Sequence, residues 1–125
     1  MMTLARIDVD DPDVDMDEGE RLLYRGALFT GEAVEYQQGA LVSLDTYKDG
    51  VSHGPTNTWY PDGTLRTEAI MEEGFPVGES KSWHPNGTLA SKRIMSPNGL
   101  RPLVEFEWDE DGNQTRHWTA DAAPR

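Results

Sequence analysis

Alternating acidic residues near the start of the chain come nearest to a metal site. Asp13, Asp15 and Asp17 are spaced like the first ligands of a calcium-binding loop. However, Gly19 comes one place late for such a loop, and the twelfth position counted from Asp13 holds Tyr24 where a bidentate glutamate is required. The sequence therefore predicts no metal site here and indicates no cofactor.

Histidine offers the next possible chemistry, because its side chain can act as a general base or as a ligand. His84 lies beside Trp83 on an expected strand that leads into a turn. Adjacent strand residues face opposite sides, so an inward Trp83 leaves His84 outward and available. The chain has no cysteine and no second histidine close to His84 in sequence. We therefore interpret His84 as a surface residue that is a candidate for binding.

The serines and glycines do not form a catalytic motif. The serines on expected strands, Ser43, Ser80, Ser82 and Ser91, lack the Gly-x-Ser-x-Gly context of a nucleophile elbow. The glycines recur at expected hairpin turns, and none of them precedes a helical stretch that could cradle a phosphate. We assign no catalytic residue.

A row of aromatic residues at matching positions is the remaining candidate. One interpretation is structural, with the rings forming the core or a stacked face. The other is a groove for a protein segment or an apolar small molecule, since buried aromatic side chains dominate interface energies. The candidate binding residues are Tyr36, Trp59, Trp83 and Trp108, with Tyr60 and His84 as their neighbours.

The elements that carry these residues follow from an internal repeat. Residues 54–65 align with residues 78–89 at a constant offset of 24, including the tryptophan, the turn glycine and the closing Thr-Leu. An earlier copy has Tyr36 in the tryptophan position, and a later copy has Trp108 there. The chain therefore contains four copies of one unit.

Each copy has the sequence of a strand, a tight turn and a second strand. Residues 61–63 (Pro-Asp-Gly) and 85–87 (Pro-Asn-Gly) are turn sequences whose glycine accepts a positive φ. Leu65, Thr67, Ala69 and Met71 are two apart and share one face. One hairpin is marginal in water, so successive hairpins must pair or stack. The sequence predicts an all-β fold of tandem antiparallel β-hairpin repeats, with a period of about 24, in an elongated, twisted meander sheet.

The chain divides into three expected parts. Residues 8–20 contain eight acidic side chains and no basic one, which is typical of a self-repelling segment. We expect an acidic N-terminal arm at residues 1–21, disordered or loosely docked, although the alternation in residues 7–10 leaves a short first strand open. The repeat domain is expected at residues 22–119, and a C-terminal tail at residues 120–125.

Charge limits the kinds of partner. The chain has 23 acidic and 11 basic residues, a net charge of -12. Such a surface repels phosphate backbones and anionic membranes and attracts basic proteins. The sequence has no apolar run of signal-peptide or membrane-span length. We expect a cytoplasmic protein that binds neither nucleic acid nor membrane.

The repeat itself resembles a known pattern. Its motif is Gly-x-x-x-x-Trp-[Tyr/His]-Pro-[Asp/Asn]-Gly-Thr-Leu, followed by a strand and a second glycine turn. This resembles the variant MORN (membrane occupation and recognition nexus) repeat and, more closely, the bacterial YwqK-type antitoxin family. The resemblance covers residues 24–118 and is strongest over residues 54–99. The first turn (residues 37–39) and Gln114 depart from the motif, as terminal repeats that cap a stack commonly do.

The resemblance implies a non-enzymatic protein-binding module, an antitoxin or immunity-type protein that neutralises a toxin. The negative charge suggests a basic toxin as the partner. The alternative is a small enzyme or ligand-binding protein that uses an aromatic pocket on the β-repeat scaffold. A membrane-peripheral adaptor is a third interpretation, which the charge disfavours. The oligomeric state stays open.

Overall fold

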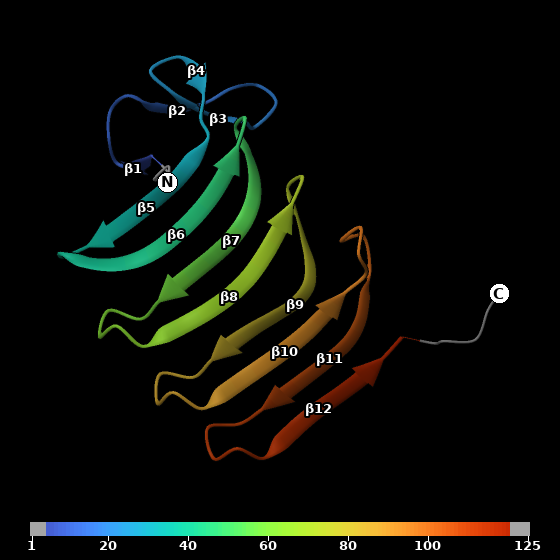
Figure 1. The fold of residues 1–125 in the computed structure, drawn as a ribbon. Helices are drawn as coiled ribbons and strands as arrows, with labels where there is room; N and C mark the ends of the chain where they lie inside the picture. Colours follow the sequence, from blue (N-terminus) through green and yellow to red (C-terminus); the bar gives the residue numbers. More distant parts are fainter. Residues whose placement is uncertain (1–4, 121–125) are drawn as a thin grey trace, which may run out of the picture.

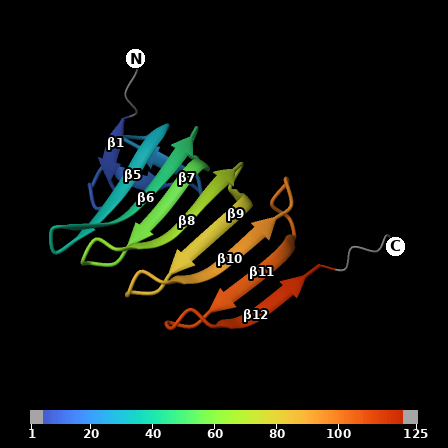
Figure 2. The ribbon, with the colours of Figure 1, turned by 60° about the horizontal axis from the view of Figure 1, so that its bottom comes forward.

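The computed structural model describes residues 5–120 as β-strands joined by turns. Nine strands form one sheet, and from β5 onward each strand pairs with the next one along the chain. These neighbours are antiparallel, and the sheet is a curved, twisted band (Figures 1 and 2). This confirms the predicted all-β meander of hairpins. The strands are β1 (Arg6–Asp8), β5 (Gly31–Gln37), β6 (Ala40–Lys48), β7 (Val51–Trp59), β8 (Leu65–Glu72), β9 (Phe75–Trp83), β10 (Leu89–Met95), β11 (Pro102–Trp108) and β12 (Gln114–Thr119).

The turns at one end of the sheet are those that the repeat motif predicts. Between β7 and β8 the amide of Gly63 donates to the Tyr60 carbonyl at 2.9 Å, and Gly63 has φ +94°. The turn between β9 and β10 repeats this bond from Gly87, with φ +87°. Three-residue hairpin loops of this kind end in a left-handed residue, which glycine adopts without steric cost. The repeated glycine therefore sets the hairpin geometry.

Other strands of the large sheet are joined by two-residue turns. Asp49 and Gly50, between β6 and β7, both have positive φ, at +51° and +82°. Gln38 and Gly39 have the same pair of signs, at +51° and +83°. Two consecutive left-handed residues define the turn that best matches the twist of a hairpin. The departure at residues 37–39 is thus a change of turn type within the same meander.

A second, small sheet precedes the meander. It consists of β2 (Val14–Met16), β3 (Leu22–Tyr24) and β4 (Ala27–Leu28), in that order. The acidic segment, for which disorder, loose docking or a short strand all stood open, forms β1 and β2, and β1 pairs in parallel with β5. The expected boundary between residues 21 and 22 falls inside this small sheet. Residues 1–4 and 121–125, parts of the expected arm and tail, lie outside the described residues.

Two arginines supply the charge that the acidic segment lacks. The Arg21 guanidinium lies 2.8 Å from an Asp17 carboxylate oxygen, and Arg25 lies 3.1 Å from Asp13. Asp17 also accepts the backbone N–H groups of Arg21 and Gly19, and these hydrogen bonds hold its pKa below the ordinary value. These pairs reduce the self-repulsion of the acidic run at Asp13 and Asp17.

The hydrophobic core lies where the small sheet packs on the first strands of the large one. It consists of Ile7, Leu22, Phe29 and Ala33, with Tyr47 packed against it. Gly50 is enclosed by the small sheet, since its amide donates to Phe29 and its carbonyl accepts from Leu22, both at 2.8 Å. The turn between β6 and β7 is therefore part of this core contact.

The rest of the large sheet is a single layer. Among residues 51–120, the buried positions are Met95, Ser96 and Gly99. On β8, burial alternates strictly, with Leu65 and every second residue after it to Met71 half-buried and the residues between them exposed. The predicted shared face of β8 is thus confirmed.

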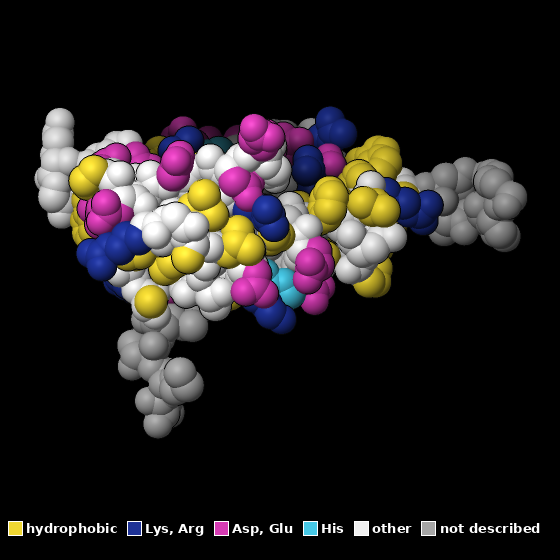
Figure 3. Space-filling view, turned by 90° about the horizontal axis from the view of Figure 1, so that it is seen from above, with side chains coloured by type: hydrophobic (Ala, Val, Ile, Leu, Met, Phe, Trp, Pro, Cys, Tyr) yellow, Lys and Arg dark blue, Asp and Glu magenta, His cyan; other side chains and the backbone are white. Residues whose placement is uncertain are grey.

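No helix within residues 5–120 is long and apolar enough to cross a membrane. Figure 3 views the molecule from the end of the sheet where the turns after β6, β8 and β10 lie. Acidic and basic side chains are both spread over this view, and hydrophobic side chains lie between them. The surface there combines charged groups of both signs with apolar area.

Candidate functional site

The predicted aromatic residues lie at one position of each hairpin, beside three-residue turns for the tryptophans and beside the two-residue turn of Gln38 and Gly39 for Tyr36. Trp59, Trp83 and Trp108 end β7, β9 and β11, and all three are half-buried. Tyr36 is 42% exposed near the end of β5. Trp59 shares a hollow of about 370 Å³ with Ala40 and Leu41 of the preceding hairpin. The Trp59 side chain therefore lies at the contact between two neighbouring hairpins.

Tyr60 and His84 form a second contact between hairpins. The Tyr60 hydroxyl donates to the carbonyl of Trp83 at 2.7 Å, one hairpin further along the chain. His84 Nε2 lies 2.8 Å from the carbonyl of Trp108 in the same way. A carbonyl oxygen can only accept, so Nε2 of His84 carries the proton. His84 is therefore held between hairpins and does not stand free on the surface.

Strand pairing aligns small hydroxyl side chains in a row across the sheet. Successive pairings join Ser43 to Thr58, Thr58 to Thr67, Thr67 to Ser82, and Ser82 to Ser91. The hydroxyls of Thr58 and Thr67 are 2.5 Å apart, so they bond to each other. Glu35 and Glu107 extend the row at its two ends. We call this side of the sheet the hydroxyl face.

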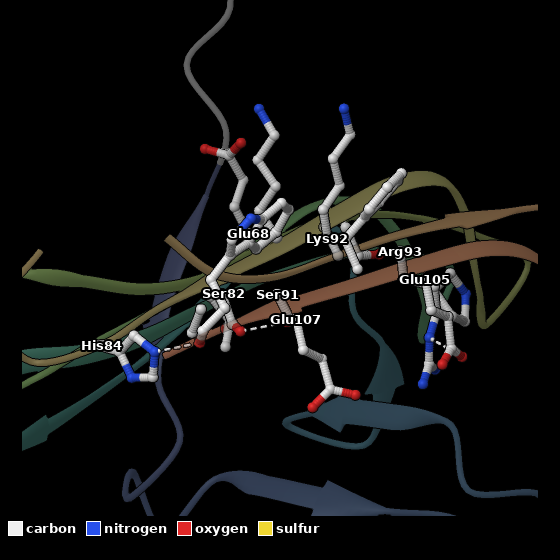
Figure 4. A pocket seen from close by; sticks show the side chains of 16 residues that line it. Glu68, Ser82, His84, Ser91, Lys92, Arg93, Glu105 and Glu107 are labelled. Carbon is white, nitrogen blue, oxygen red and sulfur yellow. Dashed lines mark hydrogen bonds and ion pairs between the residues drawn. The ribbon is translucent and has the colours of Figure 1, made fainter. Parts of the chain in front are cut away.

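The small sheet covers the hydroxyl face at β5 and at the Tyr47 end of β6. Ala33 and Glu35 are two apart on β5 and so share this face, and Ala33 is part of the core with the small sheet. Over β9 to β11 the face stays open, and Figure 4 shows His84, Ser82, Ser91 and Glu107 on the same side of these strands. These four residues help to line a hollow of about 540 Å³.

Charged side chains near this hollow pair among themselves. On the hydroxyl face, Glu105 lies 3.0 Å from Arg93 and 3.5 Å from Arg116. On the opposite face, Glu79 lies 3.0 Å from Lys81 and 3.3 Å from Lys92, and the hydrogen bonds from these two lysines lower the pKa of Glu79. These ion pairs engage Lys81, Lys92, Arg93 and Glu105 of the lining.

A different set of residues forms an apolar surface with acidic neighbours. Phe75 is 48% exposed and Leu100 is 66% exposed, although both are large hydrophobic side chains. They lie just after the turns that follow β8 and β10. A hollow of about 480 Å³ joins these two turns, and we call its lining the turn-end surface. It consists of His53, Glu72, Glu73, Phe75, Val77, Pro97, Asn98 and Leu100.

The turn-end surface is acidic. Its lining contains two glutamates, Glu72 and Glu73, and no lysine or arginine. Both glutamates are exposed, and His53 Nδ1 is 3.9 Å from a carboxylate oxygen of Glu73. Exposed apolar side chains surrounded by charge of one sign mark an interaction surface. The arrangement can bind a basic, partly apolar protein surface.

The sequence candidates did not include this surface, although the repeat contains a signal for it. The residue after the turn glycine is apolar in each repeat, as Val51, Phe75 and Leu100. The alternation of side chains along a strand predicts that an apolar residue at this position faces inward. The sequence alone does not show that Phe75 and Leu100 are exposed. Their exposure depends on how the hairpins are arranged in the folded sheet, which local sequence rules do not determine.

No group of three or more histidine, aspartate or glutamate side chains within residues 5–120 could hold a metal ion. Comparisons of the chain with models of protein families, with curated protein sequences and with solved structures found no match. The function must therefore be argued from the repeat, the charge and the exposed surfaces of this chain.

Proposed function

We propose that the chain is a non-enzymatic protein-binding module of antitoxin or immunity type, which neutralises a basic toxin by covering it. The observation that carries the proposal is the turn-end surface, where the exposed Phe75 and Leu100 line one hollow together with Glu72 and Glu73. The net charge of -12 supports it, because it attracts a basic partner over a long range. The likeness of the repeat to YwqK-type antitoxins gives the reason for choosing a toxin as the partner.

The alternative of a small enzyme has less support. The hollow beside His84 draws its lining from both faces of one sheet, since Lys92 and Ser91 are neighbours on β10. It therefore does not enclose a substrate, whereas ligand pockets bury most of the surface of their ligand. The bond from His84 to the Trp108 carbonyl also occupies the nitrogen that would act as an acid.

Co-expression tests the proposal. Products of the genes that adjoin this one are expressed with and without the chain, and cell growth and binding of the purified pair are measured. We expect the chain to restore growth against one toxic, basic product and to bind it with an affinity that falls with salt. If none of these products is toxic, or if the chain restores growth against none, the proposal is wrong.

Two variants test the surface. Phe75→Ser with Leu100→Ser removes the exposed apolar anchors, and we expect the affinity to fall at least about tenfold, because such anchors dominate interface energies. Met16→Ser is the matched control, since Met16 is 50% exposed on β2 in the small sheet. Equal binding by both variants would place the interface elsewhere on the molecule.

A further inference from the structure

The two edges of the large sheet differ in how they are closed. The β1 edge is three residues long, and Arg6 pairs there with Glu32 on β5 at 2.9 Å. The β12 edge has six residues, all of them exposed, and no described strand pairs with its outer side. An open edge presents unpaired backbone donors and acceptors that can pair with another chain.

The hydrogen bonds of β12 show which of its residues face outward. The amide of Ala120 donates to the Leu103 carbonyl on β11 at 2.8 Å, so the backbone of every second residue from Ala120 points inward. Trp118 and Arg116 therefore pair with β11, opposite Glu105 and Glu107. The N–H and C=O groups of Thr119 and His117 point away from the sheet. β12 thus offers outward backbone groups at His117 and Thr119, and its register with β11 shifts beyond Arg116, between Glu107 and Trp108.

We propose that two copies of this chain associate through their β12 strands, antiparallel and with the two-fold axis at His117. In that register the backbone N–H and C=O of His117 in one copy hydrogen-bond to those of His117 in the other, and the outward N–H of Thr119 lies opposite Thr115, at the register shift of β12. The pairing is isologous, so every contact occurs twice. It joins the two nine-stranded sheets into one continuous sheet.

The side chains of β12 suit this pairing. In the antiparallel register Arg116 lies opposite Trp118 of the second copy, on the hydroxyl face, at a position where side chains approach closely. Trp118 is 38% exposed, and a guanidinium over an indole ring is attractive. β12 itself has no acidic residue, although the chain carries a net charge of -12. The contact strand therefore avoids the repulsion that the rest of the surface would cause.

The mass of the full chain against its concentration tests the proposal. By sedimentation equilibrium from about 1 to about 500 µM, we expect the mass to rise from one chain of 14.0 kDa toward two. Thr119→Pro removes an outward N–H and leaves the inward bond of Ala120, so we expect the dissociation constant to rise more than about tenfold. Thr119→Val keeps the N–H and should retain the dimer. A wild-type chain that stays a monomer, or an unchanged dimer in Thr119→Pro, overturns the proposal.

Amide hydrogen exchange tests the register without a substitution. In the dimer, the outward amides of His117 and Thr119 become hydrogen-bonded, so their exchange should slow as the concentration rises. The amide of Trp118, already bonded to β11, serves as the internal reference. A concentration effect on amides elsewhere, with none at residues 117 and 119, shows a different interface and rejects the β12 pairing.

Discussion

Tyr60 and His84 are chemically different, yet they occupy one position of successive hairpins and make one contact. Each bonds to the backbone carbonyl of the tryptophan in the next hairpin, at 2.7 and 2.8 Å. Both side chains end in a group that can donate a hydrogen bond, a hydroxyl in Tyr60 and an imidazole N–H in His84. The position is therefore constrained to a long side chain with a terminal donor.

Substitution of His84 tests this role with a matched pair. We expect His84→Tyr to be nearly as stable as the wild type, because tyrosine makes the same bond at position 60. His84→Phe has the same ring without the hydroxyl and should lower the free energy of unfolding by about 1 kcal/mol. Urea unfolding followed by tryptophan fluorescence measures both. If the two variants are equally stable, the hydrogen bond contributes nothing.

Carboxylates at the turns give the protein an acid sensitivity of known sign. Asp109 accepts the backbone N–H groups of Asn113 and Asp111, at 2.9 and 3.0 Å, and these bonds lower its pKa. A lowered folded-state pKa contributes stability above the ordinary carboxyl pKa of about 4, and this stability is lost as the pH falls through the folded value. The effect belongs to acidic pH and is absent near neutrality.

Asp109→Asn keeps an acceptor oxygen and removes the titration. We therefore expect the stability lost between about pH 5 and about pH 2.5 to be smaller in this variant than in the wild type. Glu110→Gln is the control, because the Glu110 carboxylate makes no hydrogen bond to a described residue. Urea unfolding at a series of pH values gives the comparison. An unchanged pH profile in Asp109→Asn would contradict the assignment.

At the scale of the elements, the turn glycines differ in what surrounds them. A methyl group at Gly87 would meet nothing within 4 Å. At Gly50 it would lie 2.9 Å from Leu28 Cδ2 and 3.0 Å from the Leu22 carbonyl oxygen. The two glycines have nearly the same φ, at +87° and +82°. Alanine at Gly87 therefore has only the cost of a left-handed backbone, whereas alanine at Gly50 also has the cost of a steric overlap.

Alanine substitutions measure the two costs. Gly87→Ala should lower the free energy of unfolding by about 1 kcal/mol, the cost of a left-handed residue with a Cβ. Gly50→Ala adds overlap with the small sheet, and we expect at least about 2 kcal/mol. Thermal and urea unfolding measure the difference. Equal losses would mean that the small sheet moves away from the turn at little cost.

The elements show which features the sequence predicts. The hairpins and the shared face of β8 follow from local rules, since turn glycines and a period of two act within a few residues. The small sheet was not predicted, because Leu22 and Phe29 find their partners only when the turn at Gly50 is in place. The candidate site was missed for the same reason, because the exposure of Phe75 depends on how the turns lie together in the folded sheet.

At the scale of the whole molecule, stability is distributed unevenly along the sheet. The core of Ile7, Leu22, Phe29 and Ala33 lies at the N-terminal end, whereas β12 has no buried residue. Each hairpin contacts its neighbours in the chain, as in other repeat proteins, where stability is nearly a sum of units and nearest-neighbour contacts. Hairpins far from the core are therefore stabilised only by adjacent hairpins, and the last hairpin has only one such neighbour.

This distribution predicts a gradient of amide hydrogen exchange. At low protein concentration, inward amides of β5 and β6 should exchange slowest, those of β8 and β9 faster, and those of β12 fastest, because opening begins at the unsupported end. Mass spectrometry of peptides after exchange measures it at pH 7. Asp17→Ala removes the bonds of Asp17 to Gly19 and Arg21, so it should speed exchange in β3 and β5 and leave β12 unchanged. Uniform protection from β5 to β12 would instead show that the sheet opens as one cooperative unit, in which the core stabilises distant hairpins through the continuous ladder of hydrogen bonds.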